Sequence, residues 1–433
     1  MIKIQTTTEM IESKGGIIFA GKIARKIGLE KIKSSLVKNA GVVIAIMFGL
    51  MVEGKRDYES AGEKRRSILF QEAFGLPNMY AKETVRLYAE RMAANADEII
   101  IQLRESNVKI IKQGTLHGLK LDGNQYLPID IDTTTMDNSK SKKEGVSRTY
   151  QGYDGYHPII AYAGIEGYMI DCELRPGSQH CQKGTVEFIE KVKEQLLKVK
   201  AKGRYLFRMD SGNDSFDTLK AVSEKGCYCI IKRNKRREND EKWLKRAKRH
   251  GKRIESRKGK KVWIGTIEIP PKKKDEAVKD IRCVFEVIER KIDAQGTRLL
   301  IPEIQVNTWW TNLKCGAEKV IELYHDHATS EQFHSELKHD MDIERLPSGK
   351  FAVNKIILTI AMNAFNALRL IGQKSIVEEG QKVKRKRIGK VIRDIICVAG
   401  KLVRHGRELI LKIYEQDPSA SVFLRLNAVL DSA

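Results

Sequence analysis

The order of short apolar segments between residues 127 and 233 most constrains what this chain can fold into. Several are strand-like, with alternating or continuous apolar residues, and the longer ones between them have the 3.6-residue period of a helix. In order they are strands at 127–135, 157–164 and 168–177, a helix at 183–201, a strand at 204–210, a helix at 216–226 and a strand at 227–233. This order predicts a mixed α/β sheet.

Acidic residues stand at the ends of two of these predicted strands. In the first strand Asp130 and Asp132 project to the same side, because successive side chains of a strand alternate between its faces. Asp210 ends the strand at 204–210. An aspartate at a strand end is most often a turn former, so these positions alone do not indicate a site.

A second pattern occurs at residues 324–338, YHDHATSEQFHSELK. Tyr324, His327, Glu331 and Lys338 are three, four and seven residues apart, which places them on nearly one face of a helix. A carboxylate between a phenol, an imidazole and an ammonium suits an anion held through a metal ion. The same spacing is also typical of any solvated helix face, so the spacing alone does not decide between the two interpretations.

The row Tyr324, His327, Glu331, Lys338 resembles the Y-R-E-K signature of insertion-sequence transposases of the DDE type. The sequence departs from that signature at His327, which takes the place of the family's arginine and supplies neither a permanent charge nor a bidentate fork. Phe333-His334 is also similar to the family. The resemblance extends over about 114–372 and implies a ribonuclease-H-like sheet, with acids on the first strand, at the end of the fourth strand and on a late helix.

The resemblance also implies the roles of the site residues. The three acids, both catalytic and metal-binding, are Asp132, Asp210 and Glu331. Asp130 is the alternative first acid, but Asp132 precedes two threonines as in the family's Asp-Thr-Thr. Three carboxylates suit two Mg²⁺ ions, or Mn²⁺ in their place, about 4 Å apart. The residues expected to hold phosphate groups of the DNA are Tyr324, His327 and Lys338.

The net charge of +23 and the pI near 9.5 indicate a polyanionic partner, with nucleic acid ahead of an anionic membrane. Over half of the excess lies in 232–261, where sixteen Lys and Arg face four Asp and Glu. Strand-like segments interleave with this run, so we expect a basic β-rich insertion at 236–304 between two parts of the catalytic domain, 116–235 and 305–375. Core packing is favoured over base stacking for the tryptophans, Trp243, Trp263, Trp309 and Trp310.

The two ends of the chain are expected to be helical. Residues 1–115 are interpreted as a DNA-binding domain, with a candidate helix-turn-helix at 69–92, and 376–433 as a C-terminal helical region with a basic cluster at 382–387. The longest apolar run, 40–52, is too short to span a bilayer and is interpreted as a buried helix. The amino terminus lacks the pattern of a signal peptide, so we expect a cytosolic protein acting on the nucleoid.

These observations together favour a DNA transposase that cleaves the ends of a mobile element and joins them to a target with Mg²⁺. Such enzymes work as dimers on paired ends, which implies a homodimer on double-stranded DNA and no membrane partner. One alternative is a nuclease or resolvase on the same fold that cuts without joining. Another is a catalytically silent DNA-binding protein.

Overall fold

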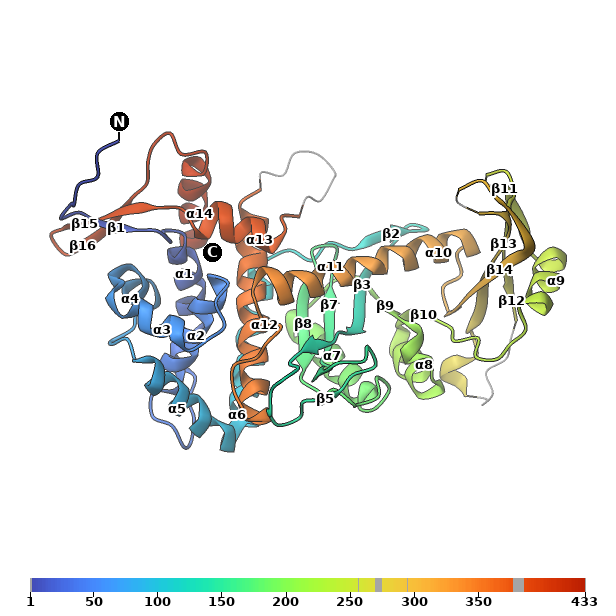
Figure 1. The fold of residues 1–433 in the computed structure, drawn as a ribbon, viewed down its shortest axis with the longest axis horizontal. Coiled ribbons are helices and arrows are strands. Elements are labelled where there is room, and N and C mark those ends of the chain that lie inside the picture. The colour runs from blue at the N-terminus through green and yellow to red at the C-terminus, as the bar shows by residue number, and fades with distance from the viewer. Residues whose placement is uncertain (1, 256, 269–274, 294, 377–384, 433) are drawn as a thin grey trace.

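The structure is a computed structural model and describes residues 2–255, 257–268, 275–293, 295–376 and 385–432. Figure 1 shows an elongated molecule. Elements from both ends of the chain lie together at one end, a large mixed sheet occupies the middle, and a β-rich extension of that sheet forms the other end.

The centre of the sheet consists of the strands predicted from the sequence. Its neighbours run in the order β8-β7-β3-β9-β10; β7 is antiparallel to β3 and β8, whereas β9 is parallel to β3 and β10. The carboxyl ends of β3 and β9 therefore meet at one edge. The strands are β3 Asn124–Thr133, β7 Ile159–Ala163, β8 Tyr168–Glu173, β9 Arg204–Met209 and β10 Tyr228–Lys232.

Short strands that the sequence analysis did not predict accompany this sheet. β2 pairs with β3, and three others form a small separate sheet beside the carboxyl end of β3. Their lengths of two or three residues leave too little alternation to recognise in a sequence. They are β2 Leu119–Leu121, β4 Met136–Asp137, β5 Ser147–Arg148 and β6 Asp154–Tyr156.

Several helices pack on the central strands. The two predicted between strands form as α7 Thr185–Val199, which contacts β8, and α8 Phe216–Ser223, which contacts β10. A third, α12 Phe351–Lys374, also packs on β8. Among the described residues α12 is the one helix long and apolar enough to cross a membrane, but 83% of its most apolar window is buried inside the protein. Burial of this kind is typical of a core helix.

The amino-terminal part is mainly helical and packs on α12 through α6 and α2. Every residue of α2 is buried, because a helix that is apolar on all sides must be covered on all sides. A short strand, β1 Met10–Glu12, precedes the helices. The helices are α1 Ile17–Ile27, α2 Ala40–Val52, α3 Glu59–Glu63, α4 Ile68–Phe74, α5 Lys82–Met92 and α6 Ala96–Gln113.

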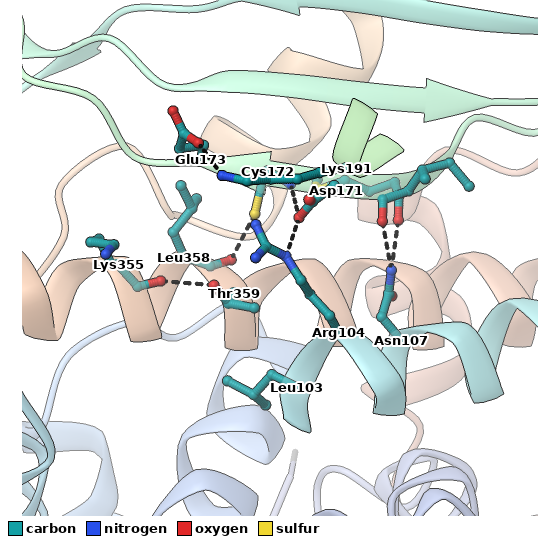
Figure 2. Close-up of polar contacts among 12 residues, drawn as sticks. Leu103, Arg104, Asn107, Asp171, Cys172, Glu173, Lys191, Lys355, Leu358 and Thr359 are labelled. Carbon is teal, nitrogen blue, oxygen red and sulfur yellow. Dashed lines mark hydrogen bonds and ion pairs between the residues drawn. The ribbon is translucent and has the colours of Figure 1, made fainter. Parts of the chain in front are cut away.

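A polar seam fixes α6 to the sheet, as Figure 2 shows. The Nε of Arg104 donates to Oδ1 of the fully buried Asp171 on β8 at 2.9 Å. One turn further along α6, the Asn107 amide donates to the backbone oxygens of Met169 and Ile170. Removing either partner of such a buried ion pair leaves a charge without compensation, so the seam holds α6 in one position on the sheet.

The prediction that 376–433 is helical is wrong over its middle. It contains a hairpin, β15 Gly400–His405 and β16 Glu408–Lys412, and β15 pairs with β1 from the other end of the chain. Gly406 forms the turn between the two strands with a φ of 59°, a left-handed conformation that glycine adopts readily and that a right-handed helix does not contain. The flanking helices are α13 Ile388–Val391, followed by a π turn at Ile392–Ile396, and α14 Ala420–Ser432. The first half of the basic cluster, 382–384, lies outside the described residues.

The basic insertion is folded and extends the central sheet, because its last strand, β14, pairs antiparallel with β10. β14 continues past the boundary expected at 304, so the insertion and the catalytic part share a strand. All four tryptophans are buried, which confirms packing as their role in the described structure. The elements are α9 Asp240–His250, β11 Lys252–Glu255, β12 Lys260–Ile267, β13 Arg282–Ile292 and β14 Arg298–Thr311.

Candidate active site

The helix predicted at 324–338 forms, but it is not one regular helix. α10 Ala317–His325 passes through a 3₁₀ turn, Asp326–Ala328, into α11 Thr329–Ser335 and then a π turn, Glu336–Asp340. The change of pitch turns His327 inward, where it is buried, and leaves the apolar Ala328 exposed. The prediction that Tyr324, His327, Glu331 and Lys338 share one helix face is therefore wrong for His327. Local departures of this kind are frequent at functional sites.

Even so, the row faces one open cavity of about 1080 Å³, together with the two strand-end aspartates. Six of the nine histidines of the chain also line the cavity and supply imidazole groups that can donate to phosphate oxygens. The six residues predicted from the sequence that line it are Asp132, Asp210, Tyr324, His327, Glu331 and Lys338. The structure thus gathers side chains from β3, the end of β9 and the late helix.

Asp132 and Asp210 lie at the carboxyl ends of the adjacent parallel strands β3 and β9. Burial opposes the charge of Asp132, but a contact from His334 outweighs it and lowers the pKa of this carboxyl. Its partner atoms are His334 Nε2, 3.4 Å from Oδ2, and the backbone N–H of Thr133, 2.8 Å from Oδ1. Burial and the neighbouring Asp132 carboxylate raise the pKa of Asp210. The two acids are therefore close enough to disfavour a charge on both at once, which a bound cation would relieve.

Asp130, the alternative first acid, does not line this cavity. It lies beneath it, where Arg208 donates two bonds of 2.7 Å to its two oxygens. The ring Nδ1 of His327 is 2.8 Å from the same carboxylate. Burial raises the pKa of Asp130, but these two bases outweigh it and lower the pKa below the usual value. Because both of its oxygens already accept hydrogen bonds, Asp130 is placed to support the cavity floor rather than to bind an ion.

His327 and Tyr324 form the wall next to that floor, with ring centroids 5.7 Å apart. Burial would lower the pKa of His327, but the Asp130 carboxylate outweighs burial and raises it. Burial and the surrounding acids, first Asp210, raise the pKa of Tyr324 above its usual range, so its hydroxyl stays protonated and acts as a donor. The Arg208 guanidinium, bound to the same aspartate as His327, brings a permanent charge close to the position where the signature has arginine.

Glu331 and Lys338 are less constrained. Glu331 is exposed, and no donor among the described residues holds its carboxylate by a hydrogen bond or an ion pair. Lys338 Nζ donates to the Thr135 backbone oxygen at 3.3 Å. Within the described part of the chain, no three His, Cys, Asp or Glu side chains stand close enough to surround one metal ion. The paired oxygen donors of Asp132 and Asp210 fit a hard divalent cation, and Glu331 has to turn inward to join them.

Sequence analysis missed several residues of this site. His157, His180 and Cys181 come from the segments around β7 and before α7 and line the cavity, but nothing in their spacing pointed to it. His334 was noted as a family resemblance but not assigned a role. Arg208 could have been found, since it stands two residues before Asp210 and faces the same side of β9.

A family described as "Transposase DDE domain group 1" matches residues 1–433, the whole chain. No curated protein matches the sequence. Among solved structures, the chain is similar to the one described as "Cryo-EM structure of piggyBac transposase synaptic complex with hairpin DNA". The identity is 12%, the match covers 89% of this chain and 80% of that chain, and the TM-score is 0.44.

Proposed function

The chain belongs to the transposase DDE domain group 1 family and is a DNA transposase, and from this premise we propose a role for each residue of the candidate site. Asp132, Asp210 and Glu331 hold divalent metal ions, for which Mg²⁺ is the physiological choice and Mn²⁺ a substitute. Tyr324, His327 and Lys338 hold the phosphates of the cleaved strand. The observation that carries the proposal is that all six line a single cavity.

The fold assignment belongs to the same proposal. The strand order β8-β7-β3-β9-β10, with only β7 antiparallel to its neighbours, supports a ribonuclease-H-like catalytic domain formed by 116–235 and 305–375. The insertion at 236–304 then lengthens that sheet with a basic surface, and 1–115 contributes a DNA-binding domain. In the candidate helix-turn-helix, Lys82 and Arg86 of α5 are paired with acids, so this segment requires rearranged side chains to contact DNA.

The chemistry follows from the surroundings of each group. Bound divalent ions activate the attacking water or 3′-hydroxyl and stabilise the charge that develops on phosphorus and on the leaving oxygen. The contact from His334 lowers the pKa of Asp132 and so favours the charged carboxylate that binds a cation. The protonated Tyr324 hydroxyl and the Lys338 ammonium donate to non-bridging phosphate oxygens, and the Asp130–Arg208 pair keeps His327 turned toward the cavity.

We further propose that the enzyme works as a homodimer on two paired element ends, in the bacterial cytosol and on the nucleoid. Joining two ends to one target needs two active sites held together, and the described residues of one chain form one cavity that gathers all six proposed site residues. Double-stranded DNA is both the donor and the target.

The test is to incubate the purified protein with DNA carrying the element's end sequence and Mg²⁺ and to separate the products on a gel. The proposal predicts joined DNA from the wild type, and neither cut nor joined DNA from Asp210→Asn, which still shifts the DNA in a binding gel. Cut DNA without joining would support a nuclease or resolvase instead. A shifted band with neither product from the wild type would support a silent DNA-binding protein.

A further inference from the structure

A second cavity, of about 350 Å³, lies where the amino-terminal helices meet the segment that follows the active-site helix. Its lining carries five basic and three acidic side chains. Arg56 and the α3 and α5 side chains come from the amino-terminal part, Lys143 from the segment between β4 and β5, and Arg345 from the segment before α12. We name Arg56, Lys143 and Arg345 the basic triad.

The acids of this cavity are already occupied. Both Glu59 oxygens accept from Lys82, and Glu83 pairs with Arg86 at 2.9 Å. Asp57 accepts from the backbone N–H and the hydroxyl of Ser60, both at 2.9 Å. Lys82 and Arg86 therefore neutralise Glu59 and Glu83, whereas Asp57 keeps its negative charge near Arg56, so the five bases and three acids leave the cavity with a net positive charge.

Lys143 is the centre of the triad and has no acidic partner among the described residues. Its Nζ donates to two neutral acceptors, the Asn138 side chain at 3.0 Å and the Leu346 backbone oxygen. Burial, and then the nearby charges of Arg56 and Arg345, lower the pKa of this ammonium. A half-buried ammonium between two guanidinium groups is a place where an anion would be stabilised.

The two arginines of the triad are only partly neutralised. Arg56 pairs with Asp342, which is half exposed, through one of its terminal nitrogens. Arg345 is 57% exposed, and its ion pair with Asp137 is long at 3.8 Å. Both guanidinium groups keep donors for a further acceptor, and the planar fork of arginine suits two oxygens of a phosphate.

Two chain segments connect this cavity to the active site. The segment from Thr135 to Lys143 runs beside the segment from Lys338 to Leu346. Three hydrogen bonds join them, one at each end and one between. The donors and acceptors are Lys338 Nζ to Thr135 O, Asn138 Nδ2 to Glu344 O, and Lys143 Nζ to Leu346 O. Eight residues of chain span at most about 29 Å. That length is about eight base pairs of duplex.

We propose that the basic triad binds a backbone phosphate of the DNA whose strand end occupies the active site, within about eight base pairs of the reacting phosphate. The contact ties the amino-terminal helices and the catalytic part to the same duplex. Because the site serves the DNA on which the enzyme acts, it rests on the function proposed above. It reads no sequence, since a phosphate contact positions the duplex without reporting its bases.

The test measures binding of a random-sequence duplex of about 30 base pairs by fluorescence anisotropy over a range of salt concentrations. Lys143→Gln and Arg345→Gln are compared with Lys202→Gln, an exposed lysine in the turn before β9, at the opposite end of that strand from Asp210. Each phosphate contact contributes about 0.9 to the slope of log K against log salt. We expect each triad variant to lose about 0.9 units of slope and the control to lose none. This loss makes the change in affinity between 50 and 200 mM salt about 3.5-fold smaller.

Because Lys143 also bonds within the fold, the thermal unfolding midpoint of each variant is measured alongside. A Lys143→Gln protein that is unfolded leaves Arg345→Gln, whose side chain is mostly exposed, to decide the outcome. Slopes equal to that of Lys202→Gln in both folded variants would overturn the inference.

A free phosphate is the other source of the same chemistry, and a titration with inorganic phosphate at constant ionic strength separates the two. Phosphate that raises the unfolding midpoint of the wild type but not of Arg345→Gln, with unchanged DNA slopes, would assign the site to a small anion and overturn the DNA contact. The proposed catalytic function is tested apart from this, since Asp210→Asn probes cleavage and the triad variants probe binding. The cleavage prediction can therefore fail while the binding prediction holds, and the reverse.

Discussion

Asp130 and Asp132 stand two residues apart on one strand and face the same side, yet their surroundings differ completely. Asp130 is closed in by Arg208 and His327 and has no oxygen left for a ligand. Asp132 lines the open cavity with Asp210, and its contacts are one backbone N–H and a longer 3.4 Å contact from His334. The comparison teaches that a site of this kind has two layers: a buried layer, in which charges neutralise each other and fix side chains, and an open layer, in which like charges are held together.

The largest effect is expected in the open layer. Asp132→Asn removes one carboxylate from the metal site while retaining its shape, so cleavage should fall by about a thousandfold or more, equivalent to several kcal/mol of transition-state stabilisation. The rate of strand cleavage in a single-turnover assay measures this loss. The denaturant midpoint of unfolding of Asp132→Asn should equal that of the wild type. Cleavage within tenfold of the wild type would remove Asp132 from the metal site.

The second-largest effect is expected from a substitution in the buried layer, which should lower the stability of the protein. Asp130→Asn leaves the Arg208 guanidinium buried without a counter-ion, and breaking such a pair costs about 3–5 kcal/mol in the free energy of unfolding. Denaturant unfolding measures it, with Asp132→Asn as the matched control on the same strand. Equal stability of the two variants would show that the layers do not differ as described.

The smallest effect concerns pH. Since Asp130 raises the pKa of His327, the stability that this pair contributes is fully present below about pH 6.5 and is lost as the pH rises through the folded pKa of the imidazole. His327→Asn should therefore be less stable than the wild type at about pH 5.5, and the difference should shrink by about pH 9. Unfolding at the two pH values checks this. A difference that grows with pH would contradict the proposed charge on His327.

Much of this arrangement was predictable because it depends on local periodicity. The strands that carry Asp132 and Asp210 and the helix that carries Glu331 follow from alternation and 3.6-residue spacing, and parallel neighbours necessarily bring two strand ends together. The hairpin of β15 and β16 was predicted to be helical although Gly406 marks its turn, and its pairing with β1, almost four hundred residues away, has no signal in the local sequence. Family matching then identified the chain as a transposase, which spacing alone could not do.

The parts that sequence could not supply depend on changes of helix pitch and on long-range contacts. A 3₁₀ turn before α11 carries His327 inward to Asp130, a contact between residues 197 positions apart. No sequence pattern within either segment predicts this contact. The same holds for His157 and His180, which reach the cavity from loops whose path the sheet determines.

The most direct test of the central claim is an anomalous difference map from crystals of the protein soaked with Mn²⁺. The account predicts a peak between the carboxylates of Asp132 and Asp210, at about 2.2 Å from their oxygens, with Glu331 turned toward it, and no peak beside Asp130. The peak should be lost in Asp210→Asn crystals. A peak at Asp130, or none near Asp132 in a protein that still cleaves DNA with Mn²⁺, would contradict the account.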